Sequence, residues 1–338
     1  MQKAGGYLVI SLDFELHWGM FDTVSISDYG EHYVGVTKAV PEMLALFSEH
    51  SIHATWATVG MLMCADKTEL LELAPRESRR PRYRDETLSA YRYLESNPIG
   101  ENERVDHHHF APSLVREIIE TPHQELASHT FSHFYCQAKQ ENPVAFAADC
   151  EAQRAVFAGY EQSPQTLIFP RNQVSSTALT AAATAGVTAY RGTEDNWLYR
   201  SGTEQPLFKR ALRLMDAYIN LSGHHTTALE RVEQRPVSNI PASRFLRPYS
   251  KKLRWLEARK LRRITDSMTH AAKHNEIFHL WWHPHNFGTN RPENLQQLQT
   301  ILQHFESLQT EYGMQSQTMN EIATVMRGAS HLATNELG

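Results

Sequence analysis

The sequence has few cysteines, no long hydrophobic run and no excess of positive charge, and each shortage argues against a class of protein. Its three cysteines, Cys64, Cys136 and Cys150, are far apart and form no CxxC motif. This pattern argues against a disulfide framework and a cysteine zinc site, and it favours a reducing cytoplasm. No stretch approaches the roughly 20 apolar residues of a membrane-spanning helix. The net charge of −5 gives no general attraction to nucleic acid.

Size and composition are typical of a soluble globular protein. Hydrophobic residues make up 41% and charged residues 21% of the 338 positions, and a chain of this length can bury a substantial core. The apolar run 7–12 has only Lys3 ahead of it and ends in Asp13. It is too short for the apolar part of a secretion signal, so it predicts a strand. We expect a single catalytic domain over residues 1–338, with insertions at about 61–110 and 198–276.

Apolar strands, polar clusters and helices alternate along the chain. This order, repeated roughly every 30 to 50 residues, predicts an α/β fold with a parallel sheet, either a barrel or a wound sheet. In such folds, polar residues at the carboxyl ends of the strands form the ligand site. We predict strands that begin near residues 7, 52, 124, 166, 187 and 277. We predict helices over 37–49, 112–120, 143–160, 175–185, 255–268, 291–312 and 319–326.

The first predicted strand ends in charged residues. Asp13, Glu15 and His17 alternate along it, so they share one face if the strand stays extended. A carboxylate directly after a buried apolar strand is unfavourable unless it has a partner or a function. The alternative is a polar strand end with solvent-exposed acids.

Two histidines follow the third predicted strand at a spacing that suits a metal site. His129 and His133 are four residues apart, so on a helical turn their rings lie on one face and converge on one cation. A carboxylate would complete such a site. Because the chain has 19 histidines, the spacing can also arise by chance, and the pair alone does not establish a metal.

Other histidine-rich and basic segments have ordinary explanations. The run from His107 to His109 is typical of a solvated loop, and His279 is typical of a satisfied core histidine. The segment from Arg244 to Arg263 contains nine Arg or Lys residues and one acid, Glu257. It predicts a solvated basic helix or, alternatively, a surface for a phosphate-bearing substrate or an anionic lipid, with peripheral membrane contact.

The polar clusters at the strand ends resemble the motifs of a known family. In order they resemble the polysaccharide deacetylases, the family 4 carbohydrate esterases with the nodulation-factor deacetylase fold, from about residue 7 to residue 323. The variants of the first and last motifs are similar to those of members that act in surface-polysaccharide biosynthesis. The resemblance implies a distorted (β/α)7-type barrel with insertions. The clusters are Asp13 to Glu15, His129 to His133, Pro170 to Asn172 and Trp282 to Pro284.

The resemblance also implies a function and a metal site. The function is removal of an N-acetyl group from an amino sugar, on a polysaccharide or on a lipid- or nucleotide-linked glycan. A divalent metal, usually zinc, would be bound by Glu15, His129 and His133. Asp13 would take the proton from the attacking water.

The remaining roles follow from the same resemblance. Arg171 would orient Asp13 and lower its pKa, because a nearby cation favours the charged form of a carboxylate. His283 would protonate the leaving nitrogen, with Asp195 as the acidic neighbour that keeps it charged. Trp18, Asn172, Trp282 and His285 would bind the substrate.

Departures from the family pattern leave alternatives open. Phe14 occupies the place of a second aspartate, so Glu15 takes the ligand role and Asp13 remains an alternative ligand. In the third motif the family usually has an arginine before the proline and an aromatic residue after it. Here Pro170 comes before Arg171, and Asn172 follows. The alternative functions are a deformylase, a cyclic amidase that works without metal, and a non-catalytic carbohydrate-binding protein. Histidine and carboxylate ligands suit zinc, iron, cobalt and nickel alike.

Overall fold

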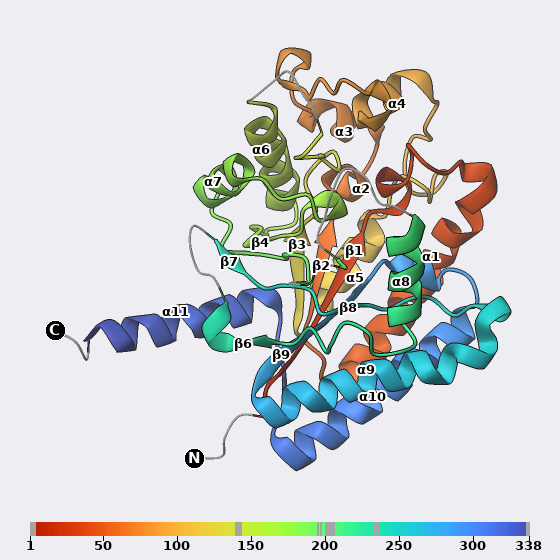
Figure 1. The fold of residues 1–338 in the computed structure, drawn as a ribbon. Helices are drawn as coiled ribbons and strands as arrows, with labels where there is room; N and C mark the ends of the chain where they lie inside the picture. Colours follow the sequence, from red (N-terminus) through yellow and green to blue (C-terminus); the bar gives the residue numbers. More distant parts are fainter. Residues whose placement is uncertain are drawn as a thin grey trace.

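The computed structural model describes residues 5–138, 144–194, 196, 198–199, 207–232 and 237–335 (Figure 1). Within these residues, ten strands form one sheet in the order β6-β9-β1-β2-β3-β4-β5-β7, with β10 beside β1 and β8 beside β9. Every strand pair of this described sheet is parallel except β6 with β9. The strands are β1 (Tyr7–Phe14), β2 (Ala54–Thr58), β3 (Gln124–Ser128), β4 (Thr166–Leu167), β5 (Ala189–Tyr190), β6 (Thr227–Ala228), β7 (Ser238–Asn239), β8 (Arg244–Phe245), β9 (Glu276–Trp282) and β10 (Gln315–Ser316).

Helices cover the outside of this sheet, with α9 and α10 packed against each other (Figure 1). Short 3-10 helices follow several strands and carry polar residues of the site. The α-helices are α1 (Ile26–Glu49), α2 (Gly60–Met63), α3 (Lys67–Leu73), α4 (Ala90–Ser96), α5 (Pro112–Glu120), α6 (Ala145–Ala158), α7 (Ser176–Thr184), α8 (Leu207–Asp216), α9 (Glu257–His274), α10 (Arg291–Tyr312) and α11 (Met319–Asn335). The 3-10 helices are η1 (Leu16–Gly19), η2 (Glu77–Arg79), η3 (Glu86–Leu88), η4 (Pro170–Asn172), η5 (Leu229–Arg231), η6 (Lys251–Leu256) and η7 (Pro284–Phe287).

Strand β1 lies between β9 and β2, and all its residues are buried. Because successive side chains of a strand point to opposite faces, β1 serves two cores. Leu8, Ile10 and Leu12 belong to the larger core, which includes apolar residues of α1, α9 and α10. Val9 belongs to a smaller cluster with Ala57 of β2, Ala127 of β3, Ile168 directly after β4, and residues of α11. Polar residues continue the Val9 face toward the carboxyl end of the strand.

The sheet is strongly curled. Arg191, directly after β5, donates hydrogen bonds to Ser11 and Asp13 of β1, although β2, β3 and β4 separate these two strands in the sheet order. In a flat sheet, four strand spacings would place them about 19 Å apart, which is beyond the reach of an arginine side chain. The described strands therefore form a curled half-barrel, and its inner face brings β1 opposite β5.

The predicted α/β class is confirmed. Helices α5 and α10 have the predicted bounds, and β3 begins at the predicted residue. Helix α1 begins at Ile26 rather than at residue 37, because the hydroxyl of Ser25 caps its first turn by accepting a hydrogen bond from the amide of Asp28. The region predicted as an insertion at 61–110 contains short helices, α2 to α4 with η2 and η3. No described helix has the length and apolar content needed to cross a membrane.

Candidate functional site

Glu15, His129 and His133 meet at the carboxyl ends of β1 and β3. Oε2 of Glu15 is 3.3 Å from Nε2 of His129 and 3.2 Å from Nε2 of His133. All three side chains are buried, and their ligand atoms lie within 4.8 Å of one another. One carboxylate oxygen and two imidazole nitrogens form a donor set that suits zinc and other divalent transition metals.

The second ring nitrogen of each histidine has its own partner. Nδ1 of His129 is 2.8 Å from the carbonyl oxygen of Ile168. Since a carbonyl only accepts, Nδ1 donates the proton and Nε2 directs a lone pair toward Glu15. Nδ1 of His133 is 3.1 Å from the hydroxyl of Tyr135. Such outer contacts fix the orientation and tautomer of metal-binding histidines.

The electrostatics of these three residues fit a bound cation. Burial raises the pKa of Glu15, but His283, His129 and His133 together bring that pKa well below its usual value, so the carboxylate is ionised. Burial lowers the pKa of His133, and Nε2 of His129 is buried with no hydrogen-bond partner. The carboxylate of Glu15 faces the lone pair on Nε2 of His129, and the two repel each other unless a cation or a proton lies between them. The residues therefore fit a divalent metal.

The two histidines reach Glu15 from a bend and not from the predicted helical turn. The loop after β3 has positive φ at Thr130 (64°) and at His133 (54°). The buried carboxylate of Asp149 in α6 holds this loop, because it accepts hydrogen bonds from the amides of Phe131 (2.7 Å) and Ser132 (3.1 Å) and from the Ser132 hydroxyl. Burial raises the pKa of Asp149 to about 6.

Glu15 is positioned by a turn that ends β1. Leu16 has a φ of 47° and begins η1, so the strand does not stay extended and the expectation that His17 shares the face of Glu15 is wrong. His17 instead packs in an aromatic cluster, with Nδ1 3.4 Å from the Tyr33 hydroxyl. Gly19 leaves room for the Glu15 carboxylate, because a Cβ on Gly19 would lie 2.0 Å from Cδ of Glu15.

Asp13 forms a buried ion pair with Arg191. Nη1 and Nη2 of Arg191 donate to the two carboxylate oxygens of Asp13 at 2.8 and 2.6 Å. The Arg191 side chain is fully buried and also lies 4.2 Å from the centre of the Trp281 ring. Burial raises the pKa of Asp13, but the charges of Arg191, His129 and His283 outweigh it and lower that pKa below its usual value. Asp13 is therefore held ionised and in one orientation.

The expected pairing of Arg171 with Asp13 is not the pairing in the structure. Arg171 lies in η4 with a φ of 54°, and this turn directs its side chain to Asp22, at 2.5 Å, and over the ring of Tyr135. Arg191 makes the contact with Asp13 instead. Its position directly after β5, where other strands also end in polar clusters, was the signal available in the sequence.

His283 lies on the other side of the two carboxylates. Its Nε2 is 3.5 Å from Oε1 of Glu15 and 3.9 Å from Oδ2 of Asp13. The side chain is 22% exposed, so it is more open to solvent than the metal-site residues. Asp195, its expected acidic neighbour, lies outside the described residues. The described acids beside His283 are Glu15 and Asp13.

Comparisons with known proteins agree with this arrangement. The family model described as polysaccharide deacetylase matches residues 20–190, just over half of the chain. The chain belongs to the polysaccharide deacetylase family. The matched range includes His129 and His133, whereas Asp13, Glu15 and His283 lie outside it. No curated protein sequence matches the chain.

Solved structures share the fold of this polysaccharide deacetylase family member. A putative polysaccharide deacetylase from Mycobacterium smegmatis is 14% identical, with a TM-score of 0.58, and the match covers 98% of this chain and 93% of that one. The allantoinase Puue is 13% identical, with a TM-score of 0.57 and coverage of 97% and 92%. A probable polysaccharide deacetylase from Pseudomonas aeruginosa PAO1 is 13% identical, with a TM-score of 0.55 and coverage of 95% and 90%. Identities this low show a shared fold only.

Three residues expected to bind substrate in this deacetylase family member are buried. Trp18 and Trp282 are fully buried core residues. Nε1 of Trp18 donates to the carbonyl of His109, and Trp282 stacks on Phe287. His285 is 3% exposed. Each of these three rings is covered by other side chains of the protein: Trp18 by Tyr93 and His109, Trp282 by Phe47 and Phe287, and His285 by Tyr29 and Tyr33.

Asn172 lies beside the ion pair of this deacetylase family member and lines a cavity. Its Oδ1 accepts hydrogen bonds from Nε and Nη2 of Arg191 at 3.3 and 3.1 Å. The cavity has a volume of about 530 Å³ and is lined largely by polar residues. One of them is Glu194, whose pKa burial raises to about 7. Others are Gln137, Thr193, Thr226 and Asn239.

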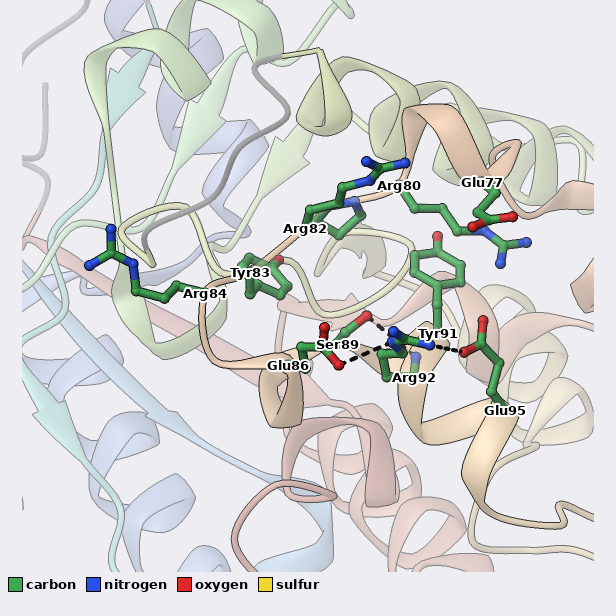
Figure 2. A pocket seen from close by; sticks show the side chains of 11 residues that line it. Glu77, Arg80, Arg82, Tyr83, Arg84, Glu86, Ser89, Tyr91, Arg92 and Glu95 are labelled. Carbon is green, nitrogen blue, oxygen red and sulfur yellow. Dashed lines mark hydrogen bonds and ion pairs between the residues drawn. The ribbon is translucent and has the colours of Figure 1, made fainter.

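A second pocket, of about 570 Å³, lies within residues 77–95 (Figure 2). Its lining is charged, and Arg92 forms ion pairs with Glu86 and Glu95, which also line the pocket. Tyr83 forms part of its wall, and the Tyr83 hydroxyl accepts a hydrogen bond from the amide of Tyr135. Since the Tyr135 hydroxyl contacts His133, two tyrosines connect this pocket to the metal-binding residues.

Proposed function

We propose that this chain is a metal-dependent hydrolase that removes an N-acetyl group from an amino sugar. The observation that carries the proposal is the convergence of Glu15, His129 and His133, with the ion pair of Asp13 and Arg191 and the ring of His283 directly beside it. Membership of the polysaccharide deacetylase family supports hydrolysis of a carbon–nitrogen bond.

The cation expected here is a divalent metal, most commonly zinc, held by Glu15, His129 and His133. Bound there, it would polarise the amide carbonyl and lower the pKa of an attacking water. Glu15 is the preferred carboxylate ligand, because its Oε2 faces both histidines. Both oxygens of Asp13 are instead bonded to Arg191, which leaves Asp13 for a role in proton transfer.

Asp13 and His283 are placed to move protons in opposite directions. In amide hydrolysis a water oxygen bonds to the carbonyl carbon, the carbon–nitrogen bond breaks, and acetate and an amine leave. Asp13 takes the water proton as general base, and His283 donates a proton to the leaving nitrogen as general acid. Oδ2 of Asp13 and Nε2 of His283 are 3.9 Å apart, so both groups can contact the same substrate amide.

The cavity beside Asn172 is the proposed place for the sugar. Its polar lining offers amide and hydroxyl groups that pair well with sugar hydroxyls. We propose a phosphate- or lipid-linked glycan as the substrate, because the exposed cations of the basic segment follow β8 at the same edge of the sheet. Three free cysteines are consistent with the cytoplasmic location that we propose.

Product analysis with the zinc-loaded protein tests this function. N-acetylated amino sugars, free and linked to a nucleotide or a lipid, should release acetate. N-formylated sugars should release little formate, and small cyclic amides should stay closed. Asp13→Asn and His283→Gln should each lower kcat by about 100-fold or more, while Glu72→Gln, which changes an exposed acid, should leave it unchanged. Release of formate without acetate would show a deformylase instead of a deacetylase, and ring opening without acetate release would show a cyclic amidase.

A further inference from the structure

Helix α8 is oriented with its apolar face outward. Phe208, Leu214 and Met215 are 68%, 41% and 48% exposed. The side that faces the protein is polar: Arg213 donates to the carbonyl of Leu198 at 2.7 Å, and Asp216 is fully buried. A surface helix normally turns its apolar stripe toward the core. This helix does the reverse, so its apolar face is available to a partner.

The exposed apolar surface continues beyond the end of α8. Ile219 and Leu221 are 48% and 49% exposed. Next to them Asp216 accepts a hydrogen bond from Arg244 at 3.2 Å and lies 3.7 Å from Arg263 of α9. The segment after α8 therefore rests on α9, and Tyr218 lies close enough to Glu257, the residue that directly follows η6, for their charges to interact. Trp255 of η6 is 71% exposed, the largest exposed fraction among the large apolar residues that the structure describes.

Exposed cations surround this apolar surface. Within the basic segment, three residues are buried and have structural roles: Arg244 and Arg263 lie beside Asp216, and Lys260 pairs with Glu257 at 2.5 Å. The cations that remain exposed belong to η6 and the outer face of α9. They are Lys251, Lys252, Arg254, Arg259 and Arg262. Arg210 adds another exposed cation on α8.

We propose that α8, the segment 217–221 and η6 form a docking surface for an anionic lipid bilayer. Outward apolar side chains, a tryptophan and a border of lysine and arginine are the features that place a helix in the interface of an anionic membrane. The two components act together, because apolar burial and attraction to anionic headgroups add.

Charge favours a bilayer over a second copy of the chain. A symmetric dimer through this surface would bring the same patch of each copy together. The exposed cations of η6 and α9 would then face their own copies, and this repulsion opposes association. An anionic bilayer neutralises the same charges.

The docking surface lies at the same edge of the sheet as the candidate active site. The ring of Phe245, at the end of β8, is 5.8 Å from the ring of His283, and the chain continues from there into η6. Docking would thus bring the site close to the headgroup region. This inference goes beyond the proposed hydrolase and does not depend on it, since binding to vesicles is measured without turnover.

Flotation of the full-length protein with lipid vesicles tests the inference. We expect binding to phosphatidylcholine vesicles that contain phosphatidylglycerol and little binding to pure phosphatidylcholine. Phe208→Ser with Met215→Ser should weaken binding at least about tenfold through lost apolar burial. Reversal of three charges, Lys251→Glu, Lys252→Glu and Arg254→Glu, should weaken it by about 100-fold or more, since each cation near an anionic surface contributes roughly fivefold.

Matched controls distinguish binding through this surface from nonspecific binding to vesicles. Val105, which is 70% exposed elsewhere, is changed to Ser, and three exposed arginines between β2 and α5, Arg82, Arg84 and Arg104, are changed to Glu. Both controls should bind like the wild type. Trp255 fluorescence should shift to shorter wavelength with anionic vesicles, and Trp255→Phe should remove the shift. Absence of binding, equal losses in the controls, or a solution dimer that the Phe208 and Met215 changes dissociate would overturn the proposal.

Discussion

Arg191 binds Asp13 through two parallel hydrogen bonds, of 2.8 and 2.6 Å, across the inside of the curled sheet. This contact joins the end of β5 to the end of β1, and it has both a structural and a catalytic role. It closes the polar interior of the half-barrel, and it keeps a buried carboxylate ionised beside the candidate metal ligands. Bidentate arginine–carboxylate pairs are the most directional of the ion pairs in proteins.

Arg191→Lys should separate the charge of Arg191 from its geometry. Lysine keeps a cation near Asp13 but cannot make two parallel bonds, so we expect kcat to fall by about tenfold or more with a largely intact fold. The pKa of Asp13 should rise, because the lowering effect of the guanidinium is weaker, and the acidic limb of the pH–rate profile should move to higher pH. An unchanged acidic limb would contradict the role of Arg191.

Arg191→Ala should be much more damaging to stability. It leaves the buried carboxylate of Asp13 without its partner, which typically costs about 3–5 kcal/mol. Urea unfolding measures the loss. Arg79→Ala is the control, because Arg79 and its partner Glu151 form an ion pair whose two side chains are both exposed; we expect a far smaller loss, since exposed ion pairs contribute little to stability. Equal losses in the two variants would contradict the pairing described above.

Gly19→Ala should weaken metal binding without removing a ligand. A Cβ at Gly19 would lie 2.0 to 2.4 Å from the carboxylate atoms of Glu15, so the carboxylate must move. Disturbing the contacts that hold a metal ligand in place commonly lowers the metal affinity by about 10- to 100-fold. Zinc titration against a chelator measures the change. Gly159→Ala is the control, since its nearest neighbour is 3.3 Å away, and retention of full affinity in Gly19→Ala would contradict the placement of Glu15.

Asp149 should give the protein a distinctive pH dependence of stability. Burial raises its pKa to about 6 in the folded protein, above the value of about 3.9 in an unfolded chain. The folded state therefore holds this proton more tightly, and the stabilisation is present at low pH and lost as pH rises through about 6. Relative to Asp149→Asn, the wild type should lose about 1.4 kcal/mol per pH unit between pH 4 and 6. A difference that does not change with pH would contradict the raised pKa.

The fold class and the outline of the metal site were predictable from the sequence because they depend on local patterns. Apolar runs followed by polar residues predict strands that end at a ligand site, and His129 and His133 stand out by spacing. The preference for Glu15 over Asp13 as metal ligand agrees with the geometry, in which Glu15 faces both histidines. Contacts between segments far apart in the sequence were harder to predict.

The pairing of Asp13 illustrates this limit. It depends on how tightly the sheet curls, and no local pattern contains that curvature, so Arg171 was chosen over Arg191. The same limit explains Trp18 and Trp282. An aromatic ring next to a catalytic motif is compatible with a sugar platform or with the core. Only the packing of Tyr93 and His109 on Trp18, and of Phe47 and Phe287 on Trp282, determines that both rings are buried. The outward face of α8 is another property of packing, because amphipathicity alone does not say which face is covered.

The most direct test of the central claim is the metal content of the tag-free protein by elemental analysis. We predict about one equivalent of a divalent metal in the wild type, lost in His129→Ala and in Glu15→Ala, and retained in Asp13→Asn and in the surface control Glu72→Gln. A wild type that contains no metal and takes up none on titration would contradict the metal site. Loss of metal in Asp13→Asn with retention in Glu15→Ala would contradict the assignment of the carboxylate ligand.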